Sequence, residues 1–279
     1  LDAATLAEDS DLPIDPSPTL AKLAKLLRDP KAKREAEPTP PGLVADLRPY
    51  QLAGFRWMRF LADHSLHGIL ADDMGLGKTM QTLAHILAEK DSGRNQGKPT
   101  LVISPTSVVP NWKAEAAKFA PSLNVLVLQG SKRRKLFNTI PHADLVLTSF
   151  ALLQRDIELL KKVPFHLVVL DEAQYIKNPA AKVAKAAYEL QSTTRLCLSG
   201  TPIENHLGEL WSLMRFLIPG FLGTQKAFRT SFQNPIEKED DEERQQLLKE
   251  RLAPLILRRT KDQVAPELPP KTILTHPIQ

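Results

Sequence analysis

Short apolar runs alternate with amphipathic helical patterns between residues 68 and 198, and this alternation constrains the fold more than any other feature of the chain. The runs have the length of buried strands, whereas the patterns between them space apolar side chains three and four residues apart. Strands that alternate with helices form a parallel sheet with helices on both of its faces. The sequence therefore predicts an α/β fold, with strands at residues 68–71, 100–104, 124–128, 144–148, 166–170 and 195–198.

Proline content and helix-favouring composition indicate how the rest of the chain is organised. Seven prolines fall in the first 45 residues, and residues 38–42 have the composition of a linker. The alternation of strands and helices ceases after Pro219, where an acidic, helix-favouring stretch begins. We expect four regions: an N-terminal extension with a short helix at residues 1–42, a main lobe at 43–219, a helical insertion at 220–257 and an exit linker at 258–279.

The composition is that of a globular chain. Apolar residues make up 42% and charged residues 25% of the 279 residues, as in ordinary globular domains. The apolar runs are shorter than the ~20 residues that cross a bilayer, so we expect no membrane segment. Cys197 has no cysteine partner for a disulfide, and no secretory leader is recognised, which favours an intracellular protein. Because residue 1 is leucine rather than methionine, we expect a fragment of a longer protein.

One loop directly follows a predicted strand and opens a predicted helix, as a phosphate-binding loop does. Gly75 and Gly77 allow the backbone to turn its amide hydrogens inward, so that they form an anion nest at the positive end of the helix. Lys78 adds a positive charge there, and Thr79 offers a hydroxyl ligand for Mg²⁺. Asp72 stands where the strict pattern has glycine, so the alternative is an ordinary strand-to-helix turn with an incidental lysine.

A pair of acids follows the strand predicted at residues 166–170. Phosphoryl transfer requires a carboxylate that helps to hold Mg²⁺ and a second group that orients the attacking water. Asp171 and Glu172 supply both at the carboxyl edge of the sheet, beside the phosphate loop if the two strands are neighbours. The alternative is an acidic pair on the surface at a strand end. Together with the loop, however, the pair indicates a nucleotide site.

Five segments resemble, in order, motifs of the Swi/Snf-type family of DNA-dependent ATPases in helicase superfamily 2. They are residues 47–51, 72–79, 171–174, 198–205, and 257–261 together with 267–271. The resemblance extends over most of the chain, and it accounts for the absent first glycine of the loop. It implies a RecA-like P-loop domain with a small helical insertion, and ATP and Mg²⁺ as its ligands.

The resemblance also implies a role for each matching residue of the nucleotide site. Gln51 would read the adenine with support from Arg48, although a glutamine there is also typical of an exposed helix start. Lys78 would bind phosphate and Glu172 would activate water. Thr79 and Asp171 would hold Mg²⁺. The nucleotide-binding loop would comprise Asp73, Met74, Gly75, Leu76, Gly77, Lys78 and Thr79.

Three further residues are implied to couple the nucleotide site to DNA. Gln174 would link the site to Ser199 and Thr201, whose hydroxyl groups would report the nucleotide state to loops that face DNA. The alternative is that Ser199 and Thr201 cap the helix that follows them.

The implied partner is the phosphate backbone of double-stranded DNA. The formal net charge of +5 is compatible with a polyanionic partner. A translocating enzyme must bind DNA of any base sequence, and contacts to the phosphates do not depend on that sequence. The resemblance places DNA contacts in loops after two strands and at basic residues near them, although a basic run is more often a solvated helix face. These candidates are Pro105, Thr106, Thr148, Ser149, Lys113, Lys132, Arg133 and Arg134. Trp112 is expected to be a core anchor.

Members of the family carry a second RecA-like lobe whose arginines reach the γ-phosphate. The sequence has no room for that lobe after Lys271, so we expect this piece to hydrolyse ATP slowly, if at all. A DNA-bound protein is a further possible partner of the full-length protein. Two alternatives stay open: a superfamily 2 RNA or DNA helicase, and a DNA-binding scaffold that does not hydrolyse nucleotide.

Overall fold

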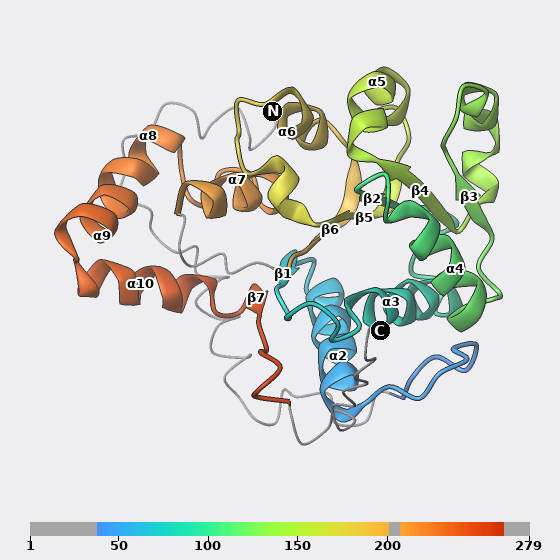
Figure 1. Cartoon of the computed structure of the whole chain (residues 1–279), viewed down its shortest axis with the longest axis horizontal. Helices are drawn as coiled ribbons and strands as arrows, with labels where there is room; N and C mark the ends of the chain where they lie inside the picture. The colour runs from blue at the N-terminus through green and yellow to red at the C-terminus, as the bar shows by residue number, and fades with distance from the viewer. Residues whose placement is uncertain (1–37, 201–206, 265–279) are drawn as a thin grey trace, which may run out of the picture.

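The computed structural model describes residues 38–200 and 207–264. These residues form an α/β fold around a seven-stranded sheet in which every paired strand is parallel to its neighbour, in the order β3-β4-β2-β5-β6-β1-β7 (Figure 1). The strands are β1 (Gly68–Leu70), β2 (Thr100–Ser104), β3 (Val125–Val127), β4 (Leu145–Ser149), β5 (Phe165–Asp171), β6 (Ser192–Leu198) and β7 (Ile256–Leu257). The short helix expected within residues 1–42 lies outside the described residues.

All six strands expected from the sequence are present, and the predicted α/β fold is confirmed. The sequence analysis missed β7, because a two-residue strand after a helical stretch has no detectable period. It also left open whether the strand before the phosphate loop, β1, and the strand before the acidic pair, β5, are neighbours. They are not, since β6 pairs with both β1 and β5 and lies between them. The carboxyl ends of all three strands still meet at one edge of the sheet, where ligands bind in open α/β folds.

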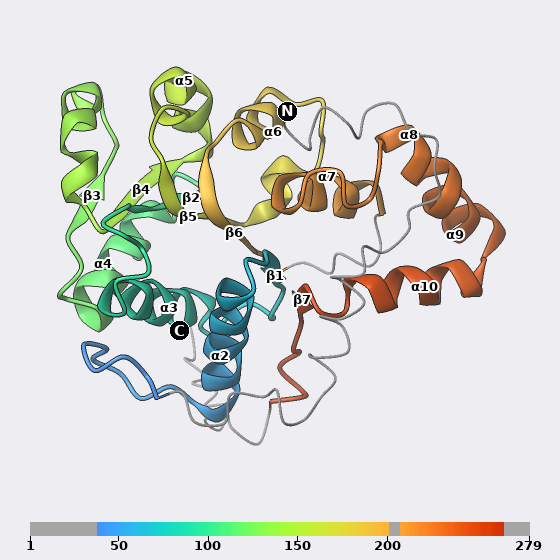
Figure 2. The same ribbon diagram turned by 180° about the vertical axis from the view of Figure 1, so that it is seen from behind.

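Helices cover both faces of the sheet (Figures 1 and 2). One face packs against α2 (Pro49–Asp63), α3 (Lys78–Asp91) and α4 (Val109–Phe119), and the other against α5 (Phe150–Leu160), α6 (Lys182–Tyr188) and α7 (Leu207–Leu217). Successive strand residues alternate between the two cores. Val168 belongs to the core under α7, whereas Val169 belongs to the core under α3. Because both faces are covered, the central strands β2 and β5 are buried along their whole length, as strands of parallel sheets usually are.

Short helices follow α7 and extend away from the sheet. They are α8 (Gln225–Phe228), the π-helix η4 (Arg229–Gln233), α9 (Asn234–Glu239) and α10 (Glu242–Leu252). After α10 the chain returns to the sheet and pairs with β1 as β7. The described chain therefore has helices where the insertion is expected, while the boundaries of the four regions remain predictions. Two 3-10 helices complete the described elements: η2 (Arg133–His142) and η3 (Ala173–Ile176).

No helix within the described residues is both long enough and apolar enough to span a membrane. Cys197 is fully buried in β6.

Candidate active site

The loop between β1 and α3 has the backbone of an anion nest. Gly75 and Gly77 have φ of 88° and 77°, in the left-handed region that favours glycine. Gly77 is also the N-cap of α3 and supplies no side-chain cap, so the first amides of this 14-residue helix are left for another acceptor. A Cβ on Gly77 would lie 2.5 Å from Nε2 of Gln51. The left-handed φ therefore favours glycine here, and a Cβ would also displace the side-chain amide of Gln51.

The ammonium group of Lys78 points back over this loop. Its Nζ donates hydrogen bonds to the carbonyl oxygens of Asp72 at 2.6 Å and Asp73 at 3.3 Å. Burial lowers the pKa of Lys78, although the charges of Glu172, Asp72, Asp171 and Asp73 act in the opposite direction. The charge of Lys78 therefore interacts with carboxylates from both motifs. Backbone carbonyls are weak partners that an anionic ligand can replace.

Asp171 ends β5 as a buried carboxylate with two donors. Its Oδ2 accepts a hydrogen bond from Nε1 of Trp112 at 2.8 Å, and its Oδ1 accepts one from the backbone amide of Glu172 at 3.0 Å. Burial raises the pKa of Asp171, and the charge of Glu172 adds to the rise, whereas the bond from Trp112 and the charge of Lys78 oppose it. The charged form of Asp171 is thus incompletely stabilised by the chain, as expected of a group that receives a cation.

Glu172 lies in a strained backbone conformation at the start of η3. Its φ of 55° and ψ of 57° are left-handed, which is uncommon for a residue with a side chain. Its Oε2 accepts a hydrogen bond from Nε2 of Gln174 at 2.8 Å, while Oε1 of Gln174 is buried and has no hydrogen-bond partner among the described residues. Strain and an unpaired buried oxygen at the carboxyl edge of a sheet are typical of functional sites.

The end of β6 joins the two motifs. Leu198 is paired with Asp171 on one side and with Leu70 on the other. The amide of Ser199 donates to the carbonyl of Leu70 at 3.1 Å, which fixes the expected coupling segment between the loop and the acids. A Cβ on Gly200 would lie 2.7 Å from Cγ of Met74 and 3.6 Å from Nζ of Lys78. Thr201 lies outside the described residues.

Gln51 is buried, so the alternative of an exposed helix-start residue is wrong. Its Oε1 accepts a hydrogen bond from the backbone amide of Arg48 at 3.0 Å, and its Nε2 donates to the carbonyl of Leu76 at 3.3 Å. The expected adenine-reading segment therefore touches the phosphate loop directly.

The side chains present fit Mg²⁺ bound together with phosphate groups. No cluster of three or more His, Cys, Asp or Glu in the described part of the chain has the arrangement of a metal site. Thr79 and Asp171 offer only a few oxygen ligands, and Mg²⁺ commonly takes one or two carboxylates, with water and substrate phosphates completing its shell. The incompletely stabilised charge of Asp171 is compatible with that arrangement.

Comparison with known proteins decides the family. The model of the SNF2-related domain matches residues 50–279. The chain belongs to the SNF2-related family. It is 41% identical over 257 residues to the TATA-binding protein-associated factor mot1 of Aspergillus fumigatus, covering 84% of this chain and 14% of mot1. It is 44% identical over 236 residues to the putative ATP-dependent helicase/translocase YwqA of Bacillus subtilis, covering 83% of this chain and 26% of YwqA.

A solved structure supports the same conclusion for the fold of this SNF2-related chain. The SWI2/SNF2 ATPase core of Sulfolobus solfataricus in complex with dsDNA superposes with a TM-score of 0.77 and 46% identity, covering 82% of this chain and 48% of that one. The resemblance to the Swi/Snf-type family and the RecA-like fold are therefore confirmed. The chain spans about half of that ATPase core and 14% and 26% of the two curated relatives named above.

The loops expected to contact DNA lie at the same carboxyl edge of the SNF2-related fold. Ser104 pairs with Ser149, so the loops after β2 and β4 are adjacent. Pro105 is half-buried and Thr106 is exposed, whereas Thr148 and Ser149 are buried. The hydroxyl of Thr148 donates to the carbonyl of Leu128 at 3.3 Å, and the hydroxyl of Ser149 has no hydrogen-bond partner within residues 38–200 and 207–264. Any contact of Thr148 and Ser149 with DNA through their hydroxyl groups would need these groups to become exposed.

The basic candidates differ in how free their charges are. Lys113 and Lys132 are exposed, and the side chain of Arg134 is 69% exposed although its Nε lies 3.7 Å from Oδ1 of Asp156. Arg133 instead donates from Nε and Nη2 to the two carboxylate oxygens of Asp156, at 2.5 Å and 3.0 Å. This pairing raises the pKa of Arg133, with the hydrogen bond to Asp156 as the main cause. Arg133 is therefore engaged in holding η2 onto α5, and its contact with DNA remains only a prediction.

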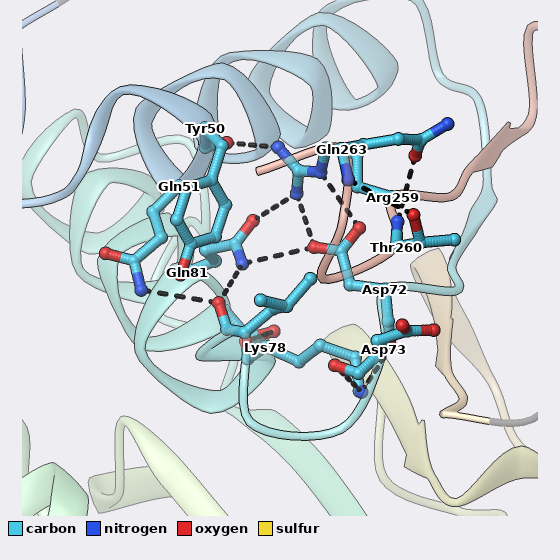
Figure 3. A network of polar contacts seen from close by, with 11 residues as sticks. Tyr50, Gln51, Asp72, Asp73, Lys78, Gln81, Arg259, Thr260 and Gln263 are labelled. Atoms are coloured by element: carbon cyan, nitrogen blue, oxygen red, sulfur yellow. Dashed lines mark hydrogen bonds and ion pairs between the residues drawn. The ribbon is translucent and has the colours of Figure 1, made fainter. Parts of the chain in front are cut away.

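Sequence reasoning missed two residues of the site. Trp112 is fully buried, as expected of a core anchor, but its indole N–H also holds Asp171. Arg259 follows β7 and pairs with Asp72 in the phosphate loop (Figure 3). The signal for Trp112 was available, because a buried indole nitrogen usually finds an acceptor. The signal for Arg259 was Asp72 itself, since an acid in place of the usual glycine needs a partner if it is buried.

Proposed function

We propose that this chain is the first ATPase lobe of an ATP-dependent translocase that acts on double-stranded DNA. The observation that carries the proposal is the convergence of Lys78, Asp171 and Glu172 on one edge of the sheet, where their charges interact across the end of β6. Membership of the SNF2-related family and the name of the Bacillus subtilis relative support it.

The residues divide the work of phosphoryl transfer. Lys78 exchanges its two carbonyl partners for phosphate oxygens, and the amides at the start of α3 bind the same anion. Thr79 and Asp171 would hold Mg²⁺, which would supply positive charge to the phosphates when bound. Glu172 accepts the proton of the attacking water on a carboxylate oxygen, while Gln174 orients that carboxylate by its hydrogen bond. Gln51 and Arg48 position the adenine beside the loop.

Hydrolysis by this chain alone is proposed to be slow. The chain covers 48% of the Sulfolobus solfataricus ATPase core, and we propose that the unmatched half of such a core supplies a second RecA-like lobe. An arginine supplied from across a cleft contributes ~10³-fold or more to phosphoryl transfer in well-studied enzymes. The second lobe is therefore a proposed partner of this chain.

The proposed DNA track follows the carboxyl ends of β2 and β4. The structural relative was solved in complex with dsDNA. In this chain, Thr106, Lys113, Lys132 and Arg134 are exposed near that edge. Each lysine that contacts a phosphate should steepen the salt dependence of DNA affinity by about one unit of log–log slope. A DNA-bound protein as a further partner is proposed from the name of the mot1 relative.

The nucleotide proposal is tested by titrating Mg-ATP into the chain and into Lys78→Ala. We expect affinity to fall about 10- to 100-fold, since a hydrogen bond to a charged group contributes about 1.5–3 kcal/mol. Lys185→Ala removes an exposed lysine of α6 and serves as the matched control, with unchanged affinity expected. Equal affinities for all three proteins would contradict the nucleotide site and favour a scaffold. Rapid DNA-stimulated turnover by the chain alone would contradict the need for a second lobe.

The DNA proposal is tested by measuring DNA affinity at several salt concentrations. Lys113→Ala and Lys132→Ala are each expected to weaken binding similarly for unrelated sequences and to flatten the salt dependence. Lys185→Ala again serves as the control. If neither variant changes the slope more than the control does, the proposed track is wrong. A strand-separation assay of the full-length protein distinguishes a translocase on duplex DNA, which should leave the strands paired, from a helicase.

A further inference from the structure

The segment that follows α10 runs beside the nucleotide loop and continues the sheet into it. The amides of Ile69 and Ala71 donate to the carbonyls of Leu255 and Leu257 at 2.8 Å and 2.7 Å. The same every-second-residue ladder goes on past the end of β1, because the amide of Asp73 donates to the carbonyl of Arg259 at 3.0 Å. The first part of the nucleotide loop is thus bonded to the chain nearly 190 residues later.

One more hydrogen bond joins the two segments beyond this ladder, from a backbone amide to a side chain. The amide of Lys261 donates to Oδ2 of Asp73 at 3.0 Å. Asp73 therefore accepts from the later segment through its side chain and donates to it through its backbone, so residues 255–261 and the loop have little freedom to move separately.

The side chain of Arg259 joins three elements of the nucleotide site (Figure 3). Its Nε donates to Oδ1 of Asp72 at 2.9 Å, and its Nη2 contacts Oδ2 of the same carboxylate. Nη2 also donates to Oε1 of Gln81 in the first turns of α3 at 2.9 Å, and Nη1 donates to the carbonyl of Tyr50 at the start of α2. The guanidinium carbon lies 5.5 Å from the centre of the Tyr50 ring.

Asp72 depends on this arginine. Its side chain has no exposed surface, and that of Arg259 is 13% exposed. A buried carboxylate that loses its partner is strongly unfavourable, so the loop cannot keep its shape without Arg259 or another cation in the same place.

Gln81 connects Arg259 to Leu76, near the end of the nucleotide loop. Its Nε2 donates to Oδ2 of Asp72 at 3.4 Å and to the carbonyl of Leu76 at 3.2 Å, the same carbonyl that Gln51 contacts. A Cβ on Gly54 would lie 2.7 Å from Nη2 of Arg259, so α2 leaves room for this network only with glycine there. Both ends of the loop are therefore held by one arginine from outside it.

We propose that Arg259 is a positioning residue for nucleotide binding and that residues 255–261 form a structural part of the nucleotide site. The inference rests on the proposed nucleotide site and extends it. By linkage, nucleotide that fixes the loop also fixes residues 255–261, and displacement of that segment weakens nucleotide binding by the same factor. The chain that continues beyond residue 261 is thereby coupled to the nucleotide state through a bonded path.

The first test measures the affinity for Mg-ADP, using a fluorescent analogue, in the wild-type chain, Arg259→Gln, Arg259→Lys and Asp72→Asn. We expect Arg259→Gln to weaken binding about 5- to 100-fold, the usual range for coupling between sites. Arg259→Lys keeps the charge but loses the two-pronged contact, so it should fall between wild type and Arg259→Gln. Asp72→Asn combined with Arg259→Gln should weaken binding less than the two single effects multiplied together, because both changes break one interaction.

A matched control is available in Asp156→Asn. Asp156 and Arg133 form a pair of similar burial, with side chains 2% and 12% exposed, on the opposite side of the fold from β7. Removing this pair should lower the urea midpoint of unfolding but leave Mg-ADP affinity of the folded protein unchanged. A purely structural Arg259 would behave in the same way as this control.

The second test follows hydrogen exchange with and without Mg-ADP. In the wild type and in Asp156→Asn, we expect nucleotide to slow exchange at the amides of Asp73 and Lys261 together. In Arg259→Gln the slowing at Lys261 should be lost.

The outcomes separate the two proposals. If the wild-type chain does not bind Mg-ADP, the proposed function fails. If it binds, and Arg259→Gln retains both affinity and the exchange response, only the role of Arg259 is overturned. Should Arg259→Gln fail to fold, Arg259→Lys decides, since unchanged affinity and exchange in that variant would contradict the inference.

Discussion

Two buried carboxylates lie near opposite ends of β5, Glu89 of α3 and Asp171 of β5 itself, and their pKa values are shifted in opposite directions. Near the amino end, Glu89 of α3 contacts His166, whose Nε2 lies 2.7 Å from Oε2 of Glu89, and forms an ion pair with Arg59. At the carboxyl end, Asp171 has a raised pKa, mainly because of burial. Burial also acts to raise the pKa of Glu89, but the bond with His166 and the charges of nearby cations hold it below its ordinary value.

The difference shows where the chain supplies its own counterions and where it does not. The charge of Glu89 is stabilised within the fold, so this cluster holds α2 and α3 against β5. The charge of Asp171 is not fully stabilised within the fold, although Lys78 is near enough to interact with it. A buried group whose charged form the protein disfavours is a candidate for ligand chemistry. The carboxylate near the amino end of β5 thus stabilises the fold, whereas the one at the carboxyl end is a candidate for binding a ligand.

The largest effect that would sharpen this comparison is expected at Glu89. Glu89→Gln removes one charge of the buried pair that Glu89 forms with Arg59, so the free energy of unfolding should fall by about 3–5 kcal/mol. Urea unfolding measures this loss. Mg-ATP affinity of the molecules that remain folded should not change. A variant as stable as the wild type would show that the contacts of Glu89 with His166 and Arg59 do not stabilise the fold.

Asp171→Asn is the matching change at the other end. The raised pKa means that the ionised form is disfavoured, so losing the charge itself should cost little. The asparagine amide can accept only one of the two hydrogen bonds that Trp112 and the amide of Glu172 donate, so stability should fall by about 1–3 kcal/mol, less than at Glu89. Mg-dependent nucleotide affinity should fall sharply, since a ligand of the cation is lost. The comparison breaks if Asp171→Asn destabilises the chain as much as Glu89→Gln does.

Acid should weaken the fold through His85, which is buried beside the pair of Glu89 and Arg59 and interacts with their charges. Burial lowers the pKa of His85 from 6.5 to about 4, so the unfolded chain takes up a proton that the folded chain refuses as the pH falls through this range. Stability is then full above pH 6.5 and declines by about 1.4 kcal/mol per pH unit for each such group until about pH 4. His67, whose pKa burial also lowers to about 4, adds a second contribution.

The measurement is the free energy of unfolding in urea at several pH values between 7 and 5. His85→Gln should reduce the slope by the share of one histidine. A slope identical to that of the wild type would mean that His85 is not held neutral by burial.

A smaller effect is expected when the donor to Asp171 is removed. Trp112→Phe keeps a ring in the core but removes the hydrogen bond at 2.8 Å. The pKa of Asp171 should rise further, so Mg-dependent nucleotide affinity should fall about 3- to 10-fold, in line with about 1 kcal/mol for one hydrogen bond, and more at lower pH. Trp211→Phe is the control, since Nε1 of Trp211 donates to the carbonyl of Gly223 instead. Equal effects of the two variants on Mg²⁺ dependence would contradict the role of Trp112.

The sequence predicted the sheet and the nucleotide motifs because both depend on local patterns. Apolar runs mark β2 and β5 wherever they fall in the chain, and Gly75, Gly77 and Lys78 lie within four residues of one another. The order of the strands was not predictable in this way. That β6 lies between β1 and β5 depends on how the whole chain closes.

The contacts that were missed join residues far apart in sequence. The pairing of Asp72 with Arg259 and of Asp171 with Trp112 leaves no periodic signal, because each is one contact between distant segments. Arg133 is a further example. Its place in a basic run suggested a DNA contact, but the local pattern could not reveal that the fold pairs it with Asp156. Long-range charge pairing is decided by topology rather than by local pattern.

The most direct test of the account is a crystal structure of this chain with Mg-ADP. We predict that the phosphates lie against the amides at the start of α3 and that Nζ of Lys78 leaves the carbonyl of Asp72, now 2.6 Å away, to bind a phosphate oxygen. Electron density for Mg²⁺ should lie between the phosphates and the side chains of Thr79 and Asp171. Nucleotide bound elsewhere, with Lys78 still on its two carbonyls, would contradict the central claim.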